Sequence, residues 1–333
     1  MAARYDTSEY MYCSSRIRAM ENRIVGKERI DRLADLRTSS DVMSELSDMG
    51  LDASANRAER EELLSSYLSE IYSEVIKMLA DPSILDFLRY QYDCHNLKAA
   101  IKCFIRKTDS LGMMIPLGTL SESDIIRAVA ESSWDILPTH MREAAPRAIE
   151  AYSKTSNPQQ IDIIIDKACH EDMLESADDS GVGYSVMLVK TKIDLQNIVM
   201  CCRICRMGNS ISDRAILNDA LLDGGYLSKN DLFASSEQGE KKLLDSLGFS
   251  AYSSLTTAIA ESDGSLSAFE RCCDDFFMEK VKGAKFVSFG AEVAIGFLLA
   301  HEYEIKNLRI IFAGKDAELG SDTIRKRLRI SYV

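Results

Sequence analysis

The sequence predicts an all-α protein made of three similar helical units. Proline is scarce: there are five prolines in 333 residues, and none follows Pro158. Long segments without proline that are rich in Leu, Ala, Glu and Lys favour helices. In addition, a short motif of an acidic residue, two variable residues and an asparagine recurs at domain-sized intervals, which is typical of repeated helical modules.

The clearest helix is expected over Arg57–Ala80. Apolar residues recur there at spacings of three and four, as from Leu64 to Ile71, while Glu and Ser occupy the other positions. Pro82 should end this helix, because a proline disfavours helical geometry in the residue before it. A second helix is expected from Ser83 to about Lys107, so the pair predicts a helical hairpin.

Two apolar runs, Ile161–Ile165 and Leu308–Phe312, resemble strands by propensity alone. Both are predicted to be helical, because each lies inside a longer helix-like window. Loops are expected at Glu171–Gly183, which contains Asp-Asp-Ser-Gly, and around Ser236–Gly239.

The internal repeat is the observation on which the fold prediction depends. Its three asparagines stand at positions 96, 197 and 307, at intervals of 101 and then 110 residues. In each copy an acidic residue lies three positions before the asparagine and an aliphatic residue follows it. The six repeated residues, which are candidates for a protein interface or for bonds between helices, are Asp93, Asp194, Glu304, Asn96, Asn197 and Asn307.

A second repeated landmark supports the same period. Gly118–Ser121 recurs as Gly225–Ser228, and an aspartate follows each serine by three positions, at Asp124 and Asp231. This pattern predicts a glycine turn followed by a serine N-cap, since a serine hydroxyl at that position accepts a backbone N–H from the first helical turn.

The predicted units are residues 1–112, 113–215 and 216–333. Each is expected to end in the helix that carries the acidic–Asn motif. A weaker match between Leu46–Leu51 and Leu244–Phe249 links the first and last units, with Gly50 and Gly248 placed as helix C-caps.

The charge of the chain argues against nucleic acid as a partner. The formal net charge is -12, whereas nucleic-acid binders need a basic footprint. The one dense basic run, Arg325–Arg327 with Arg329, is interpreted as a helix end. The longest apolar runs are short, as at Ala294–Ala300, where a membrane-spanning helix needs about 20 residues. With no secretory signal at its start, the chain is expected to be cytoplasmic.

Motifs for catalysis or cofactor binding are incomplete. Gly26-Lys27 and Gly314-Lys315 lack the rest of a phosphate-binding loop, so no nucleotide is expected. His301-Glu302 begins a zinc-protease motif, but the second histidine is replaced by Ile305. We therefore expect no catalytic residues, cofactor or metal.

One cysteine cluster keeps an alternative open. Cys202 and Cys205 form a C-x-x-C motif that could serve thiol chemistry or half a zinc site. In the repeat, however, Cys202 falls where the other copies have Ile101 and Phe312, so a packing role is favoured. A thiol or metal protein remains an alternative function.

Three interpretations of the repeated polar residues remain open. The acidic residues could pair with Arg89 and Lys190, four positions earlier, on a solvated helix face. The asparagines could form hydrogen bonds between helices, which is typical of polar groups at the edge of an apolar face. The carboxylates could instead contact a partner protein.

The three motif helices, with Arg16–Glu21 and Leu298–Arg309, resemble the C subunit of bacterial and archaeal V-type (A-type) ATPases, which is called the d subunit in eukaryotes. The resemblance covers nearly the whole chain. It implies three similar helical domains around a pseudo-threefold axis, in a funnel shape.

The resemblance also implies a function. Members of this family are non-catalytic rotor proteins that link central-stalk subunits D and F to the membrane proteolipid ring. Such a protein couples ATP hydrolysis or synthesis to proton or sodium transport and is peripheral on the inner face of the membrane. A helical scaffold or adaptor outside an ATPase remains a further alternative.

Overall fold

The computed structural model describes residues 6–49, 55–108, 110–207, 210–261 and 264–333. Within these ranges every regular element is an α-helix or a 3-10 helix, and no strand occurs. The all-α class predicted from the sequence is confirmed. The chain divides into two compact units, which are described separately below.

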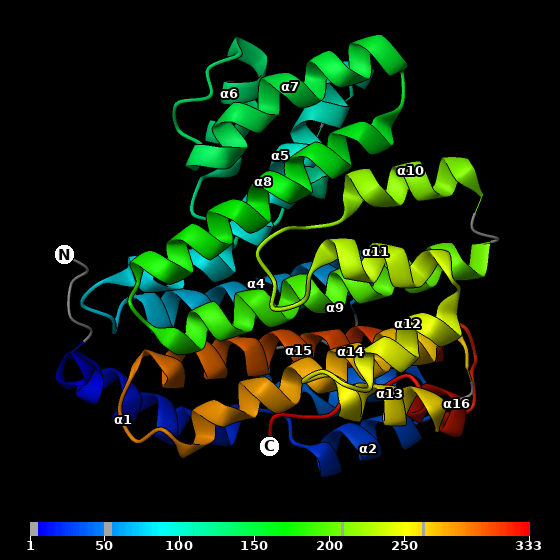
Figure 1. Ribbon diagram of the computed structural model, residues 1–333. Helices are drawn as coiled ribbons and strands as arrows, with labels where there is room; N and C mark the ends of the chain where they lie inside the picture. The colour runs from blue at the N-terminus through cyan, green and yellow to red at the C-terminus, as the bar shows by residue number, and fades with distance from the viewer. Residues whose placement is uncertain (1–5, 50–54, 109, 208–209, 262–263) are drawn as a thin grey trace. The chain divides into compact units, whose positions relative to one another are not determined.

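Unit 1 consists of Pro82–Leu247. Its α-helices can be followed in Figure 1 from cyan through green to yellow. They are α5 (Asp86–Arg106), α6 (Glu122–Glu131), α7 (Thr139–Thr155), α8 (Pro158–Asp179), α9 (Gly183–Met207), α10 (Ile211–Ala220), α11 (Lys229–Glu237) and α12 (Glu240–Leu247), with 3-10 turns η4 (Pro82–Leu85) and η5 (Leu111–Met113).

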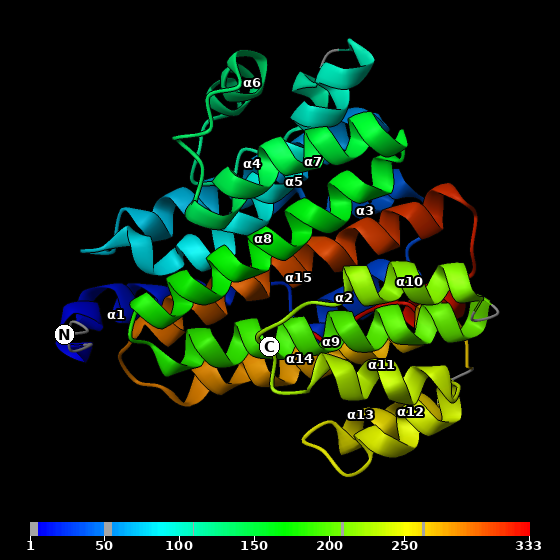
Figure 2. The same cartoon turned by 45° about the horizontal axis from the view of Figure 1, so that its top comes forward.

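Helix α8 organises unit 1, because it packs against α5, α7 and α9. Figure 2 shows α7 and α8 side by side along much of their length. Ile161, Ile165 and Met173 of α8 are buried in these contacts. Two of the motif helices, α5 and α9, therefore share one supporting helix.

Unit 2 combines Asp6–Asp81 with Gly248–Val333. The long helix α15 packs against α1, α2, α3, α4, α14 and α16, and it is buried over most of its length, including Phe297 and Leu298. The elements are η1 (Thr7–Tyr10), α1 (Met11–Met20), η2 (Glu21–Arg23), α2 (Lys27–Asp35), α3 (Ser39–Glu45), η3 (Ser47–Met49), α4 (Arg57–Ile76), α13 (Ser253–Ala260), α14 (Leu266–Val281), η6 (Lys282–Phe286), α15 (Ala291–Asp316) and α16 (Ser321–Arg325).

The two helices predicted on either side of Pro82 both form, but their ends at the junction differ from the prediction. Helix α4 begins at Arg57 as predicted, and Asn56 and Glu59 form a reciprocal capping box there. It ends at Ile76, four residues earlier than expected. The next helix begins at Asp86, because the Pro82–Leu85 segment forms a 3-10 turn instead.

The structure confirms the predictions for the two strand-like runs and contradicts one of the loop predictions. The two strand-like runs are helical, as predicted, within α8 and α15. The prediction of a loop over Glu171–Gly183 was wrong, because α8 continues to Asp179. Met173 and Ala177 are buried there and extend the apolar face of the helix. Only Ser180–Val182 separates α8 from α9. A break does occur between α11 and α12, at Gln238 and Gly239. The C-cap predicted at Gly50 lies outside the described residues.

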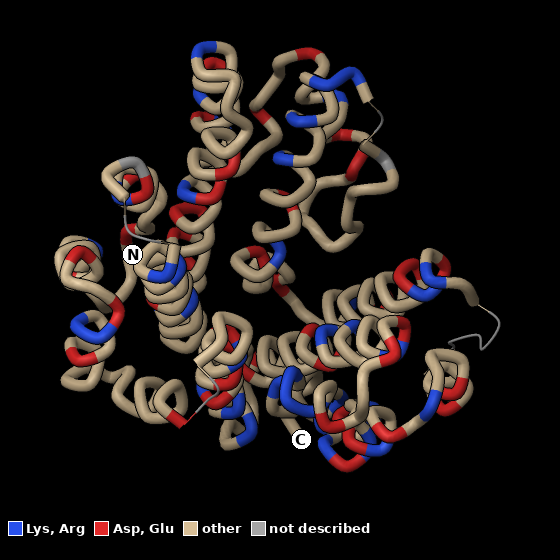
Figure 3. The backbone as a smooth tube through the Cα atoms, turned by 90° about the vertical axis from the view of Figure 1, so that its right-hand side faces the viewer, with Lys and Arg blue, Asp and Glu red and all other residues tan. Residues whose placement is uncertain are grey.

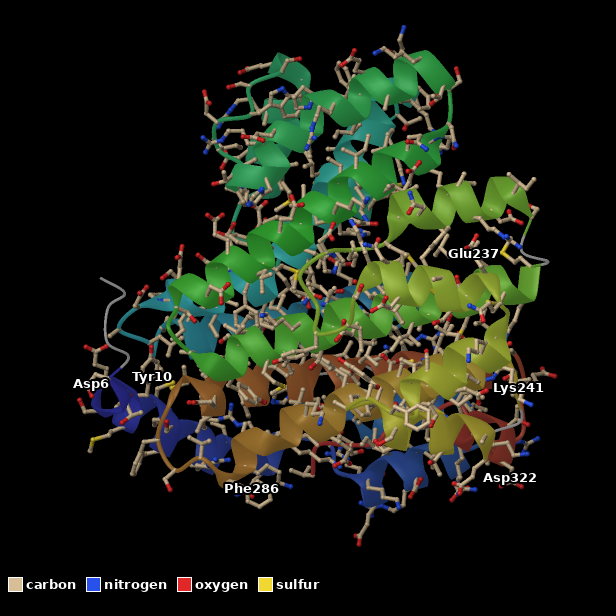
Figure 4. All side chains as sticks on the ribbon, viewed as in Figure 1. Asp6, Tyr10, Glu237, Lys241, Phe286 and Asp322 are labelled. Carbon is tan, nitrogen blue, oxygen red and sulfur yellow. The ribbon has the colours of Figure 1, made fainter. Side chains whose placement is uncertain are left out.

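Charged residues of both signs are distributed over the helices, as Figure 3 shows. Exposed apolar side chains also occur, for example Phe286 of η6, which is 90% exposed and projects from the ribbon in Figure 4. In the basic run near the C-terminus, Arg325 lies in the last turn of α16 and Arg329 pairs with Asp274 at 2.8 Å. Among the described residues, no helix is both long and apolar enough to span a membrane.

Candidate functional site

In the first copy of the repeat, Asp93 and Asn96 of α5 hold the segment that leads into α6. Asp93 accepts hydrogen bonds from the backbone N–H groups of Thr119 (2.9 Å) and Leu120 (3.1 Å), and from the Thr119 hydroxyl (2.6 Å). The Asn96 amide pairs with both backbone groups of Ile115, accepting from its N–H (2.8 Å) and donating to its carbonyl (2.9 Å). We call this arrangement joint 1.

The second copy has the same arrangement, which we call joint 2. Asp194 of α9 accepts the backbone N–H groups of Tyr226 (3.0 Å) and Leu227 (3.1 Å). Asn197 pairs with the N–H and carbonyl of Leu222 at 2.8 and 2.9 Å. The serines predicted as N-caps follow directly: Ser121 caps α6 and Ser228 caps α11.

The third copy, joint 3, is completed by a segment from the other end of the chain. Asn307 of α15 pairs with the N–H (2.8 Å) and carbonyl (3.0 Å) of Arg329. Glu304 accepts the backbone N–H of Val25 at 3.3 Å. Val25 directly precedes Gly26, the N-cap of α2. Leu120 and Leu227 likewise directly precede the N-caps of α6 and α11. In all three joints, therefore, the carboxylate holds the residue before a helix N-cap.

Two glycines allow the close approach of chain and carboxylate in joints 1 and 2. A Cβ atom added to Gly118 would overlap the carboxylate of Asp93, and one added to Gly225 would overlap that of Asp194. Neither glycine has a backbone conformation that disfavours other residues. The requirement for glycine at these two positions is therefore steric.

The three carboxylates are shielded from water. Asp93 and Asp194 are 0% exposed and Glu304 is 3% exposed. The interpretation that they form pairs on a solvated helix face is therefore wrong. Burial raises the pKa of Asp93, and the hydrogen bonds from Thr119 and Leu120 partly offset that rise.

Arg89 and Lys190, one helical turn before Asp93 and Asp194, contact the same chain segments as these carboxylates. The guanidinium of Arg89 donates to the carbonyls of Leu117 and Gly118, next to the bonds that Asp93 accepts. The ammonium of Lys190 lies 5.6 Å from the centre of the Tyr226 ring. Both cations thus contact the segment that the neighbouring carboxylate binds, and Arg89 also lowers the pKa of Asp93 somewhat by its charge.

Joint 3 has a feature that the other two lack. Nδ1 of His301 lies 3.0 Å from Oε2 of Glu304, and both side chains are buried. The His301 ring also packs edge-on against Phe297, with ring centres 4.6 Å apart. An imidazole thus lies beside the one carboxylate for which a single backbone donor is found.

The alternative function as a thiol or metal protein depends on Cys202 and Cys205, of which Cys202 is buried and Cys205 is only partly exposed. The Cys205 thiol donates to the carbonyl of Ser236 at 3.3 Å. Burial raises the pKa of Cys205 and raises that of Cys201 to about 12. Raised thiol pKa values oppose formation of the reactive thiolate. In the described part of the chain, no cysteine belongs to a group of three potential metal ligands.

Within the described residues, these features define an all-α protein in which each repeated helix is tied by buried hydrogen bonds to the segment before another helix. The chain belongs to the ATP synthase (C/AC39) subunit family, whose sequence pattern matches residues 13–327. The family expected from the sequence is thereby confirmed.

Individual relatives agree with this assignment over most of the chain. The C subunit of the A-type ATP synthase of Methanocaldococcus jannaschii is 22% identical over 348 residues, covering 97% of this chain and 87% of the relative. The corresponding protein of Methanothermobacter thermautotrophicus is 24% identical, covering 93% and 85%. The C subunit of the V-type sodium ATPase of Enterococcus hirae is 23% identical, covering 81% of each chain.

Proposed function

We propose that this chain is a non-catalytic component of the rotor in an A/V-type ATPase or ATP synthase. It would connect the central-stalk subunits D and F to the membrane proteolipid ring, and so couple ATP hydrolysis or synthesis to ion transport. The observation that carries the proposal is the family match over residues 13–327, which spans nearly the whole chain. In this role the protein lies on the cytoplasmic side, bound to the membrane through the ring.

The joints support a mechanical role, because a coupling element must resist deformation under load. Each joint holds its chain segment through buried hydrogen bonds to the backbone, as Asn197 does with Leu222. Such bonds are costly to break, since water cannot replace them in the interior. We propose that the six repeated residues act as internal stiffeners of the protein rather than as direct contacts to the stalk.

The joints also support a division into three related units, as expected from the repeat. In this proposal the third unit takes α2 from the N-terminal part of the chain, because Val25 stands in joint 3 where Leu120 and Leu227 stand in the others. The arrangement of the three units about a common axis, as a funnel, stays a prediction from the family resemblance.

Co-purification tests the proposed partners directly. A tagged copy of the chain, expressed in its native host at its normal level, should retain the D and F stalk subunits and the proteolipid in mild detergent. A stiffness variant such as Asn197→Ala should retain the same partners if the joints are internal, and lose them if Asn197 contacts the stalk. Recovery of the tagged chain without any ATPase component would contradict the proposed function.

A further inference from the structure

An imidazole ring lies between two carboxylates on the surface of unit 1. His140, in the first turn of α7, has Nδ1 at 3.4 Å from Oε2 of Glu171 and Nε2 at 3.4 Å from Oε2 of Glu175. The two glutamates are one turn apart on α8, so they lie on the same helix face. All three side chains are partly exposed, with His140 at 36%. The ring is thus accessible from solvent.

A buried aspartate fixes the position of this ring. Asp172 of α8 is 2% exposed and accepts the backbone N–H groups of His140 (2.8 Å) and Met141 (2.9 Å). It therefore attaches the start of α7 to α8. His140, Asp172 and Glu175 each offer one potential ligand atom, and these three atoms lie within 4.8 Å of one another. No other group of three or more potential metal ligands occurs in the parts of the chain that are described.

Two carboxylates flank the ring. A neutral imidazole has one N–H and one nitrogen lone pair. If Nδ1–H points to Glu171, the lone pair of Nε2 faces the carboxylate of Glu175, and either a second ring proton or a metal ion at Nε2 removes the repulsion. The imidazole distinguishes this group from an ordinary acidic patch on a chain of net charge -12.

The distance between Nε2 and Glu175 is compatible with a metal ion between them. Both ring nitrogens lie 3.4 Å from a carboxylate oxygen, slightly beyond the usual N–H···O distance of about 2.7–3.2 Å. Two ligands that bind one zinc ion at about 2.1 Å in tetrahedral geometry are themselves about 3.4 Å apart. Glu171, on the other ring nitrogen, has the place of the carboxylate that commonly orients a metal-binding histidine.

We propose that His140, Asp172 and Glu175 form a binding site for a divalent transition metal ion, with zinc as the best match. One imidazole nitrogen and two carboxylate oxygens are a ligand set that zinc accepts, and a water molecule completes the tetrahedron. The bound ion links the first turn of α7 to α8. This site is independent of the coupling function proposed above.

Calorimetry on the full-length, chelator-treated protein tests the proposal. We expect one zinc ion to bind, and His140→Ala and Glu175→Gln each to weaken its affinity at least tenfold. His95→Ala is the matched control, because His95 is an exposed histidine of the same unit whose ring nitrogen contacts only the carbonyl of Met113 at 3.0 Å among the bonds found. Circular dichroism of the metal-free variants establishes that each is folded.

Cobalt(II) substitution identifies the ligands, since the chain also has nine cysteines. The expected spectrum is that of a four-coordinate ion without a thiolate-to-cobalt charge-transfer band, and it should disappear in the folded Glu175→Gln variant. Absence of zinc binding would overturn the proposal. So would binding that is unchanged in His140→Ala and Glu175→Gln, or a cobalt complex with thiolate bands.

Discussion

The backbone N–H of Val25 donates a hydrogen bond to Oε2 of Glu304, joining two residues that are 279 positions apart. In joints 1 and 2 the corresponding donors, Leu120 and Leu227, follow their aspartates by only 27 and 33 positions. The third carboxylate thus takes its backbone N–H donor from the N-terminal part of the chain. The first two take theirs from the segment that follows the motif helix. The stability of α2 should therefore depend on a residue near the C-terminus.

Substituting Glu304 tests this dependence. In Glu304→Ala the buried N–H of Val25 loses its acceptor, which typically costs about 1–3 kcal/mol. Hydrogen exchange should become faster at Val25 and along α2, while the amides of Thr119 and Tyr226 should keep their protection. Glu279→Ala, an exposed glutamate of the same unit, is the control. Unchanged exchange at Val25 would show that Glu304 does not hold this segment.

The glycines of joints 1 and 2 give a prediction about packing. Gly118→Ala and Gly225→Ala should each destabilise the protein by about 1–3 kcal/mol, because the new methyl group displaces a buried carboxylate from its backbone donors. Gly183→Ala is the control: nothing lies within 4 Å of a Cβ at that position, and Gly183 opens helix α9. Urea unfolding of the three variants measures the difference. Equal stability of all three would refute the steric account.

The asparagines should be individually important for stability. Asn197→Ala leaves both backbone groups of Leu222 without partners in a buried setting. The expected loss is about 2–4 kcal/mol, from two unsatisfied groups. Asn218→Ala, at an exposed position of α10, should change the unfolding free energy by less than about 0.5 kcal/mol. A small effect at Asn197 would mean that water or another side chain replaces its amide.

Acid sensitivity should depend on a buried histidine of α8. Burial lowers the pKa of His170 to about 4, and its Nδ1 lies 2.7 Å from the carbonyl of Asp166. Since the pKa of an unfolded histidine is about 6.5, the neutral ring stabilises the fold above that pH, and this contribution is lost as the pH falls towards 4. The loss amounts to about 3 kcal/mol for a shift of this size.

Comparing the native chain with His170→Gln isolates this effect. Glutamine can also donate to the Asp166 carbonyl but does not titrate. The difference in unfolding free energy between the two proteins should therefore change between pH 7 and pH 4.5, with the native chain losing more. A constant difference over that range would show that His170 is not a buried neutral group in the folded protein.

Several helices could be predicted from the sequence because their signals are local. Apolar spacing located α4, and the serine N-caps of α6 and α11 could be read from Gly118–Ser121 and Gly225–Ser228. Helix ends were less predictable. The Asp-Asp-Ser-Gly sequence resembles a loop, yet buried contacts of Met173 and Ala177 carry α8 through to Asp179.

The joints themselves could not be predicted from the sequence, although all six motif residues were identified. Asp93 and Gly118 are 25 positions apart, whereas Asp194 and Gly225 are 31 apart, so no constant spacing connects carboxylate and turn. The role of Val25 has no sequence signal at all, because its partner lies at the opposite end of the chain. The cluster at His140 was missed because its residues combine the start of α7 with one face of α8.

Ion pumping by a reconstituted complex is the most direct test of the central claim. Vesicles that contain the A/V-type ATPase with and without this chain should hydrolyse ATP in both cases, but only the complex that includes the chain should accumulate ions. Adding the purified chain back should restore pumping. Ion accumulation at the full rate without the chain would contradict a coupling role.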